Sequence, residues 1–244
     1  DGVRLRGTAS IGLAVYPDHA DSTKDLLMFA DNMMYRAKAA GKDQVAVPSQ
    51  NDVVEIFRDI SQKSLMVIEA IENRSVVPFF QPILDVAGRR IVAYEILSRI
   101  ELKGEMIRAD EFVEIAEKIG VIHRLDMLVL ERALSILNEQ GHDGEIFVNL
   151  SPRALVFSEF ARDLRRIVAA SGVAPERIVF EITERDTVKN LALLERFLND
   201  LKADGFKLAI DDFGSGFSSF HYLRRFPIDY LKIEIGRASC RERV

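Results

Sequence analysis

Hydrophobic and polar positions recur with two different periods along this chain, and the changes between them predict its elements. Residues 8–16 and 44–47 have the alternation of short strands, whereas the apolar side chains over 22–41 recur at helical spacing. Ser22 followed by Asp25 three positions later predicts a capping box at the start of that helix. The chain therefore opens with a strand, a helix and a second strand.

A polar break separates this opening from the rest. Residues 48–51 carry no apolar side chain after Pro48, and a helical pattern follows them. We therefore expect a small first domain, a connector helix, a large second domain and a short tail, with these bounds: 1–50, 51–74, 75–234 and 235–244.

The second domain alternates strand and helix patterns, which is typical of α/β proteins. The predicted strands are 76–84, 91–97, 145–150, 177–183, 206–210 and 228–233, and the predicted helices are 110–119, 124–139, 153–170 and 187–204. The later strands are apolar on both faces, as buried parallel strands are, and the first two could form a hairpin across 86–90. A barrel or a doubly wound sheet would suit this order.

Composition narrows the class of protein. The 244 residues are 48% hydrophobic with a net charge of −5, which is enough apolar surface for a large core. No apolar run reaches the ~18 residues of a membrane span, and the interspersed charges argue against nucleic acid as a partner. Cys240 is the single cysteine, so a disulfide framework is excluded, and we expect a reducing, cytoplasmic location. Upstream segments of a parent protein could still anchor it to a membrane.

Polar side chains stand at the ends of the predicted strands. They are Glu95, Asn149, Glu181, Asp211, Asp212 and Lys232. In (β/α) barrels these ends meet at one mouth, where crowded carboxylates would need cations to neutralise them. An all-oxygen donor set suits Mg²⁺ or Mn²⁺ better than zinc.

Any one of these groups could instead be a helix cap or a solvated charge. Asp211 and Asp212 are a weak signal as a pair, because neighbouring side chains on a strand point to opposite faces. The glycine- and serine-rich segment 212–219 could be a plain turn or a loop that positions metal ligands. The recurrence of polar ends on successive units favours a site.

Several motifs resemble, in order, those of the EAL domain family of bacterial cyclic di-GMP phosphodiesterases. They are Phe80-Gln81-Pro82-Ile83, Glu95-Ile96-Leu97, Val148-Asn149-Leu150-Ser151, Glu181-Ile182-Thr183-Glu184, Asp211-Asp212-Phe213-Gly214-Ser215-Gly216 and Leu231-Lys232-Ile233. Ile96 stands where the family has alanine. The resemblance implies a modified (β/α)₈ barrel and hydrolysis of cyclic di-GMP to linear pGpG.

The resemblance also implies roles for individual residues. Two metal ions, Mg²⁺ or Mn²⁺, would be held by Glu95, Asn149, Glu181, Asp211 and Asp212. Lys232 would place or deprotonate the attacking water, and Glu184 would tether the loop after Asp212. The dinucleotide would be contacted by Gln81, Leu97 and Arg99, and the parent protein would be a homodimer.

The first fifty residues resemble the C-terminal end of a GGDEF domain, the diguanylate cyclase family. The matching segments are 10–17 and 30–38. The Gly-Gly-Asp-Glu-Phe signature is absent from this sequence, so cyclase activity is not expected here. We therefore expect a fragment of a tandem GGDEF-EAL signalling protein.

The pattern of the EAL family stops at Ile233, two βα units early, so we expect an incomplete barrel with little activity of its own. Residues 236–244 have no apolar period, and their back-translation resembles a sequencing adapter, which suggests an artefactual tail. Two other functions stay open: a receptor that binds cyclic di-GMP without cleaving it, and a scaffold that regulates a partner protein.

Overall fold

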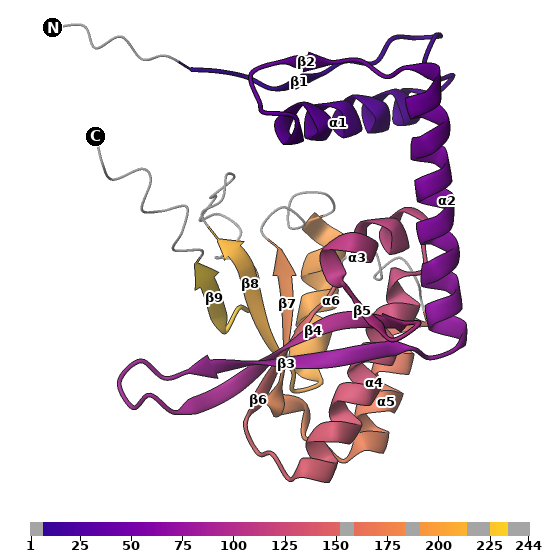
Figure 1. Ribbon diagram of the computed structural model, residues 1–244. Helices are drawn as coiled ribbons and strands as arrows, with labels where there is room; N and C mark the ends of the chain where they lie inside the picture. The colour runs from indigo at the N-terminus through magenta and orange to yellow at the C-terminus, as the bar shows by residue number, and fades with distance from the viewer. Residues whose placement is uncertain (1–6, 152–158, 184–190, 214–224, 234–244) are drawn as a thin grey trace, which may run out of the picture. The chain divides into compact units, whose positions relative to one another are not determined.

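A computed structural model describes residues 7–151, 159–183, 191–213 and 225–233 of the chain (Figure 1). The chain divides into two compact units, Asp1–Leu65 and Met66–Val244. The division falls inside helix α2 (Gln50–Glu72), within the connector predicted from the sequence. Among the described residues, no helix is both long enough and apolar enough to cross a membrane.

The first unit is a helix with a two-stranded parallel sheet. Strand β1 (Ile11–Gly12) pairs with β2 (Val45–Ala46), and α1 (Thr23–Ala39) lies between them in the chain. The N-cap half of the predicted capping box is confirmed, because the Ser22 side chain accepts a hydrogen bond from the backbone N–H of Asp25; the Asp25 carboxylate accepts from the Ser22 hydroxyl and not from its backbone N–H. The core of the unit is a cluster of buried residues from the two helices: Phe29, Met33 and Ile56.

The strand predicted over 8–16 is much shorter in the structure. Gly12 explains why the pairing strand lies so close to α1: a Cβ at this position would be 1.8 Å from the carbonyl oxygen of Ala30. The parallel partner β2 has only two residues, so little backbone pairing is available to extend the ladder.

The second unit is an α/β fold built on a seven-stranded sheet. Its strands are β3 (Val76–Leu84), β4 (Ile91–Leu102), β5 (Glu105–Arg108), β6 (Glu145–Asn149), β7 (Ile178–Thr183), β8 (Lys207–Phe213) and β9 (Tyr230–Ile233). Its helices, besides the end of α2, are α3 (Ala109–Lys118), α4 (Ile122–Gln140), α5 (Phe160–Ser171), α6 (Leu191–Ala203) and the short 3₁₀ helix Pro175–Arg177.

The strand order is β3-β4-β6-β7-β8-β9, with β5 added to β4. The predicted hairpin is confirmed, since β3 and β4 are antiparallel, and every pair from β4 to β9 along this order is parallel. Helix α4 packs against β3 and α5, and α6 packs against β8, so helices cover the outer face of the sheet (Figure 1). In the described residues the sheet ends at β3 and β9.

The sequence prediction missed β5 and ended β4 too early. Strand β4 continues to Leu102 and turns back through Lys103 and Gly104, both with positive φ, to pair with β5. The turn has no proline or asparagine to signal it, and β5 has only four residues.

The inner face of the sheet is arranged in layers. Its middle layer is a buried apolar cluster of Ala93, Phe147, Val179 and Ala209, with Ile83 and Tyr230 packed against it. Because side chains alternate between faces, the residues two positions further along these strands share the same inner face. Those residues include the polar strand ends Glu95, Asn149, Glu181, Asp211 and Lys232.

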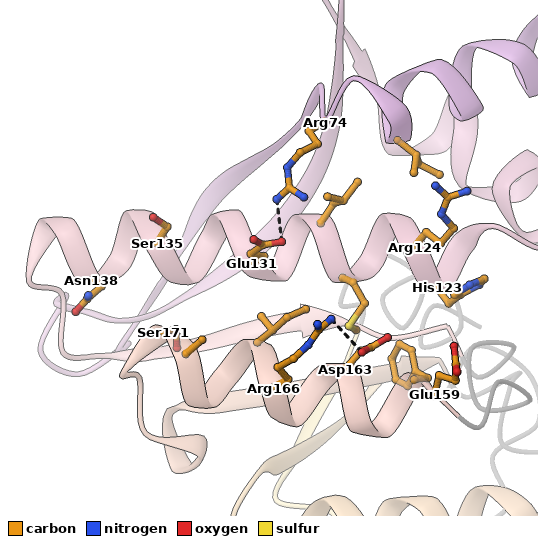
Figure 2. A pocket seen from close by; sticks show the side chains of 16 residues that line it. Arg74, His123, Arg124, Glu131, Ser135, Asn138, Glu159, Asp163, Arg166 and Ser171 are labelled. Carbon is orange, nitrogen blue, oxygen red and sulfur yellow. Dashed lines mark hydrogen bonds and ion pairs between the residues drawn. The ribbon is translucent and has the colours of Figure 1, made fainter.

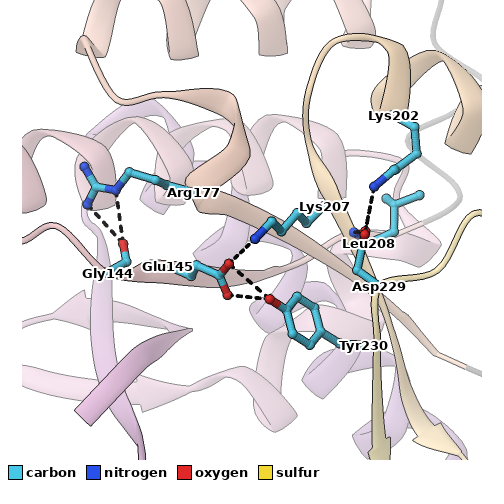
Figure 3. A network of polar contacts seen from close by, with 8 residues as sticks. All are labelled: Gly144, Glu145, Arg177, Lys202, Lys207, Leu208, Asp229 and Tyr230. Atoms are coloured by element: carbon cyan, nitrogen blue, oxygen red, sulfur yellow. Dashed lines mark hydrogen bonds and ion pairs between the residues drawn. The ribbon is translucent and has the colours of Figure 1, made fainter. Parts of the chain in front are cut away.

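A polar network closes the opposite end of the same strands (Figure 3). The Glu145 carboxylate pairs with Lys207 and accepts a hydrogen bond from the Tyr230 hydroxyl, with oxygen–oxygen distances of 2.8 and 3.0 Å. Lys202 donates to Asp229 at 2.9 Å. This network ties β6, β8 and β9 together at their amino ends, below the apolar layer, and so fixes the register that aligns the polar ends above it.

Candidate functional site

The ammonium group of Lys232 lies among three carboxylates from three other strands. Its Nζ is 2.9 Å from Oε2 of Glu95, 2.8 Å from Oε1 of Glu181 and 3.6 Å from Oδ1 of Asp211. These residues belong to β4, β7 and β8, whereas Lys232 belongs to β9. The convergence that the strand-end positions predicted is therefore present for these four side chains.

Register explains why residues so far apart in sequence meet. Glu181 stands opposite Asn149 on one side and Ala209 on the other, and Thr183 stands opposite Asp211. Parallel strands in this register carry one polar residue each past the apolar layer and onto the same edge. The sheet itself thus brings the site together.

Burial and neighbouring charge give Glu181 unusual electrostatics. Its side chain is 0% exposed, and burial raises its pKa to about 7 against the opposing influence of Lys232, while Glu95 and Asp211 raise it further. Burial lowers the pKa of Lys232, but its bonds to Glu181 and Glu95 outweigh that effect, so its pKa is raised. The site therefore holds a charged ammonium within a group of carboxylates.

Asp212 reaches the site by a backbone irregularity. The pairing of β8 with β9 shifts register between Ile210 and Phe213, and Asp212 has a φ of 55°. This bulge frees Asp212 from the strict alternation that would send its side chain away from Asp211. Asp212 and Asn149 both line a cavity of about 580 Å³ that also touches Glu181.

The predicted dinucleotide contacts lie on the first hairpin. Gln81 is directly opposite Glu95 in the β3–β4 pairing and is exposed, and Leu97 lines the same cavity as Asn149. Arg99 places its guanidinium 5.4 Å from the centre of the Phe79 ring. Glu184, expected to tether the following loop, lies outside the described residues.

The donor chemistry of this mouth fits a hard divalent cation. Glu95, Glu181 and Asp211 supply oxygen ligands around one positive charge, and the buried Oε1 of Glu181 accepts no well-directed hydrogen bond among the described residues despite its ion pair. Yet no group of three or more His, Cys, Asp or Glu side chains in the described ranges is arranged to hold a metal ion. A metal ion could bind these carboxylates only if the Lys232 ammonium moved away or if each carboxylate contacted both Lys232 and the ion.

Sequence reasoning missed Asp126, a carboxylate on α4. Asp126 lines the cavity beside Leu125 and Asn149, and its Oδ2 is buried with no hydrogen-bond partner among the described residues. A signal was present: Asp126 is four positions after Ile122, on a helix face that is otherwise apolar.

A larger cavity, of about 1260 Å³, lies between α4 and α5 (Figure 2). Charges of both signs line it, and some are paired within it: Arg74 with Glu131 at 2.8 Å, and Arg166 with Asp163 at 3.0 Å. Its balanced charge, and a lining that includes none of the polar strand ends, separate it from the carboxylate site.

Comparisons with known proteins place this chain among signalling proteins. The sequence model of the EAL domain matches residues 65–237. The biofilm architecture maintenance protein MbaA of Vibrio cholerae is 34% identical over 93% of this chain and 29% of its own length. The cyclic di-GMP phosphodiesterase NbdA of Pseudomonas aeruginosa is 30% identical over 96% of this chain and 30% of its own length. The chain thus spans less than a third of these curated relatives.

Comparison with solved structures also points to the EAL domain family. A solved structure of the PaMucR phosphodiesterase in complex with c-di-GMP superposes with a TM-score of 0.67 and 29% identity, and covers 74% of this chain and 76% of that chain. The matched sequence region contains every strand of the second unit, together with the polar strand ends. This chain therefore belongs to the EAL domain family.

Proposed function

We propose that the second unit is a phosphodiesterase domain that hydrolyses cyclic di-GMP to linear pGpG. The observation that carries the proposal is the convergence of Glu95, Glu181 and Asp211 on Lys232 at the carboxyl ends of parallel strands. The named activity of NbdA and the ligand in the PaMucR structure support the substrate.

The proposal includes two divalent cations, Mg²⁺ or Mn²⁺. The residues that would hold them are Glu95, Asn149, Glu181, Asp211 and Asp212. Such ions lower the pKa of a bound water molecule and stabilise the negative charge that develops on a phosphodiester during hydrolysis. They would also reconcile an acidic mouth with an anionic substrate.

Residues of the chain itself would position the attacking water and the substrate. Lys232 donates hydrogen bonds within the carboxylate group and is 28% exposed, so it can also orient a water molecule or a phosphate oxygen that enters from the mouth. Gln81 and Leu97 flank Glu95 on the inner face of the hairpin, where they would contact the substrate. Arg99 lies further along the same strand and carries the positive charge that a phosphate group requires.

One observation favours a second candidate, a receptor that binds cyclic di-GMP without cleaving it. Lys232 pairs with three of the proposed metal ligands, so its ammonium would take the place of an ion and neutralise part of their negative charge. A scaffold that regulates a partner protein is a third candidate, and it predicts neither dinucleotide binding nor turnover.

We further infer that the chain comes from a tandem GGDEF-EAL protein, cytoplasmic in this part and homodimeric. The resemblance of residues 10–17 and 30–38 to the end of a GGDEF domain supports the tandem arrangement.

The experiment that separates the candidates is turnover by the full natural protein. Cyclic di-GMP and pGpG would be measured chromatographically with Mg²⁺, with Mn²⁺ and with a chelator, and binding would be measured in parallel by calorimetry. Metal-dependent formation of pGpG is the expected result. Binding without turnover under all three conditions would establish the receptor, and the absence of both would leave the scaffold.

A further inference from the structure

Two arginines stand directly opposite each other where β4 pairs with β5. Arg99 of β4 is the register partner of Arg108 of β5. Directly opposite residues of antiparallel strands project to the same face, with Cβ atoms about 4.5–5.5 Å apart, and like charges so placed destabilise the pairing of the strands. A negatively charged group bound between the two side chains would remove this cost.

Both arginines project to the face of the sheet that carries the carboxylate site. Ala93 belongs to the buried layer on the inner face, and side chains alternate along β4. Glu95 and Arg99 therefore project to the inner face as well, and Arg108 joins them as the partner of Arg99. At ~3.4 Å per residue, the backbone of Arg99 lies at most ~14 Å along β4 from that of Glu95. The same face thus carries positive charge a short distance from the carboxylates.

The contacts of the two guanidinium groups leave hydrogen-bond donors over. Among the described residues Arg99 contacts no carboxylate: its Nη1 donates to the backbone oxygen of Ser98 at 2.8 Å, and its guanidinium lies 5.4 Å from the centre of the Phe79 ring. Arg108 pairs with Asp110 at 3.2 Å, but these side chains are 68% and 70% exposed, so the pair adds little stability. Each guanidinium group has more N–H donors than these contacts use.

We propose that Arg108 is a further substrate-binding residue, which forms with Arg99 a two-arginine site for the phosphate of cyclic di-GMP that is not hydrolysed. A cyclic dinucleotide has two phosphates, and the one that is cleaved lies at the carboxylate mouth with the metal ions. The other phosphate requires positive charge elsewhere on the same face. Two guanidinium groups supply it, together with charge-assisted hydrogen bonds to the phosphate oxygens. This inference rests on the proposed function and adds Arg108 to the contact expected of Arg99.

The test measures the affinity for cyclic di-GMP by calorimetry, and kcat and KM by turnover, in the full natural protein. Arg108→Ala should weaken binding and raise KM about 5- to 20-fold, because a hydrogen bond to a charged group is lost. Its kcat should stay within about threefold of the parent, since the contact is to a part of the substrate that does not react. Arg108→Lys should recover part of the affinity, because it keeps the charge without the paired donors.

The matched control is Arg90→Ala. Arg90 is an exposed residue just before the other end of β4, so this variant removes the same charge from the same hairpin. Affinity and KM should both stay within about twofold of the parent, because exposed charges at a distance are screened by salt.

A second variant separates substrate binding from an effect on the fold. Arg108 is the residue that precedes α3, so its loss could disturb the start of that helix. Asp110→Asn removes the ion pair but keeps the Arg108 guanidinium. It should bind cyclic di-GMP as tightly as the parent or up to about threefold more tightly, because Arg108 is then released from an exposed pair. A disturbance of α3 would weaken binding in both variants.

The outcomes are distinguishable. Parental affinity in Arg108→Ala would overturn the inference, and so would equal weakening in Arg108→Ala and Asp110→Asn. A fall in kcat at unchanged KM would overturn it too, because the contact would then be to the reacting phosphate. If the parent binds cyclic di-GMP without cleaving it, the phosphodiesterase proposal fails, while the affinities still decide the role of Arg108. If the parent binds none, both proposals fail.

Discussion

Lys232 Nζ and Glu181 Oε1 lie 2.8 Å apart, in a pair whose two members differ sharply in burial. The Glu181 side chain is 0% exposed, whereas that of Lys232 is 28% exposed. Glu181 therefore depends on a cation for its charged form, and Lys232 is the cation that the fold itself supplies. The Glu181 carboxylate is also a proposed metal ligand. The Lys232 ammonium and a divalent ion should therefore compete for it.

Lys232→Met should destabilise the second unit when divalent ions are removed. Loss of one partner of a buried pair costs ~3–5 kcal/mol, and the partial exposure of Lys232 reduces this to ~1–3 kcal/mol. Denaturant unfolding in a chelator measures the loss, and Mn²⁺ should restore part of it. Lys118→Met, which breaks an exposed pair with Glu114, should change stability by less than ~0.5 kcal/mol. Equal effects of the two variants would contradict the special role of Lys232.

Glu95→Ala and Asp211→Ala should each abolish hydrolysis, with a fall in turnover of ~10²–10³-fold or more, because each removes a proposed metal ligand at the mouth of the sheet. The fold should persist, since both side chains lie beyond the apolar layer. Turnover of cyclic di-GMP at saturating Mg²⁺ is the measurement, and Glu105→Ala, an exposed carboxylate on β5, is the control. Near-parental turnover in either variant would refute the ligand assignment.

Ca²⁺ should support dinucleotide binding and block cleavage. It accepts the same oxygen ligands but takes longer bonds and more of them, so the attacking water would be misplaced. Calorimetry in Ca²⁺ should show binding of cyclic di-GMP, and chromatography should show no pGpG. Strong turnover with Ca²⁺ as the only divalent ion would be the contrary result.

Asp126 should make stability fall as pH rises. Its pKa is about 8 in the folded chain and ~3.9 in an unfolded one, so between these values the folded state retains a proton that the unfolded state has released. The free energy of unfolding should therefore decrease through this window, by up to ~1.4 kcal/mol per pH unit from this group. Asp126→Asn removes that contribution.

Denaturant unfolding of the parent and Asp126→Asn at pH 5, 6, 7 and 8 provides the check. The difference in free energy of unfolding should move steadily in favour of Asp126→Asn as pH rises. A difference that is constant across the series would show that the Asp126 pKa is not raised in the folded chain.

Gly12→Ala should disrupt the first unit. The added Cβ would meet the backbone oxygen of Ala30 at 1.8 Å and the backbone nitrogen of Met34 at 2.3 Å, and helix backbone cannot move aside cheaply. We expect a loss of ~1–3 kcal/mol or more, seen as faster hydrogen exchange in α1. Gly7→Ala, where no heavy atom lies within 4 Å of the new Cβ, should leave exchange unchanged. If the α1 amides of Gly12→Ala are as well protected from hydrogen exchange as those of the parent, Gly12 is not as close to the α1 backbone as the structure indicates.

The apolar and polar pattern by itself determined the element types and the place of the chemistry. Strands β6, β7 and β8 are short, with middle residues that are apolar on both faces, as in a covered parallel sheet, and each carries a polar residue toward its carboxyl end. Because parallel strands share one direction, the prediction that Glu95, Glu181, Asp211 and Lys232 converge needed no knowledge of the order of the strands.

Tertiary structure decided what depends on register and on packing across elements. The bulge that lets Asp212 line the cavity is a local break in the pairing of β8 with β9, and alternation along one strand cannot reveal it. Asp126 looked like one polar residue on an amphipathic helix, and only the tertiary structure placed it in the wall of the cavity that Asn149 and Glu181 also line. Periodicity reports the environment that each element prefers, whereas the partner of a side chain is set by distances between elements that only the folded chain defines.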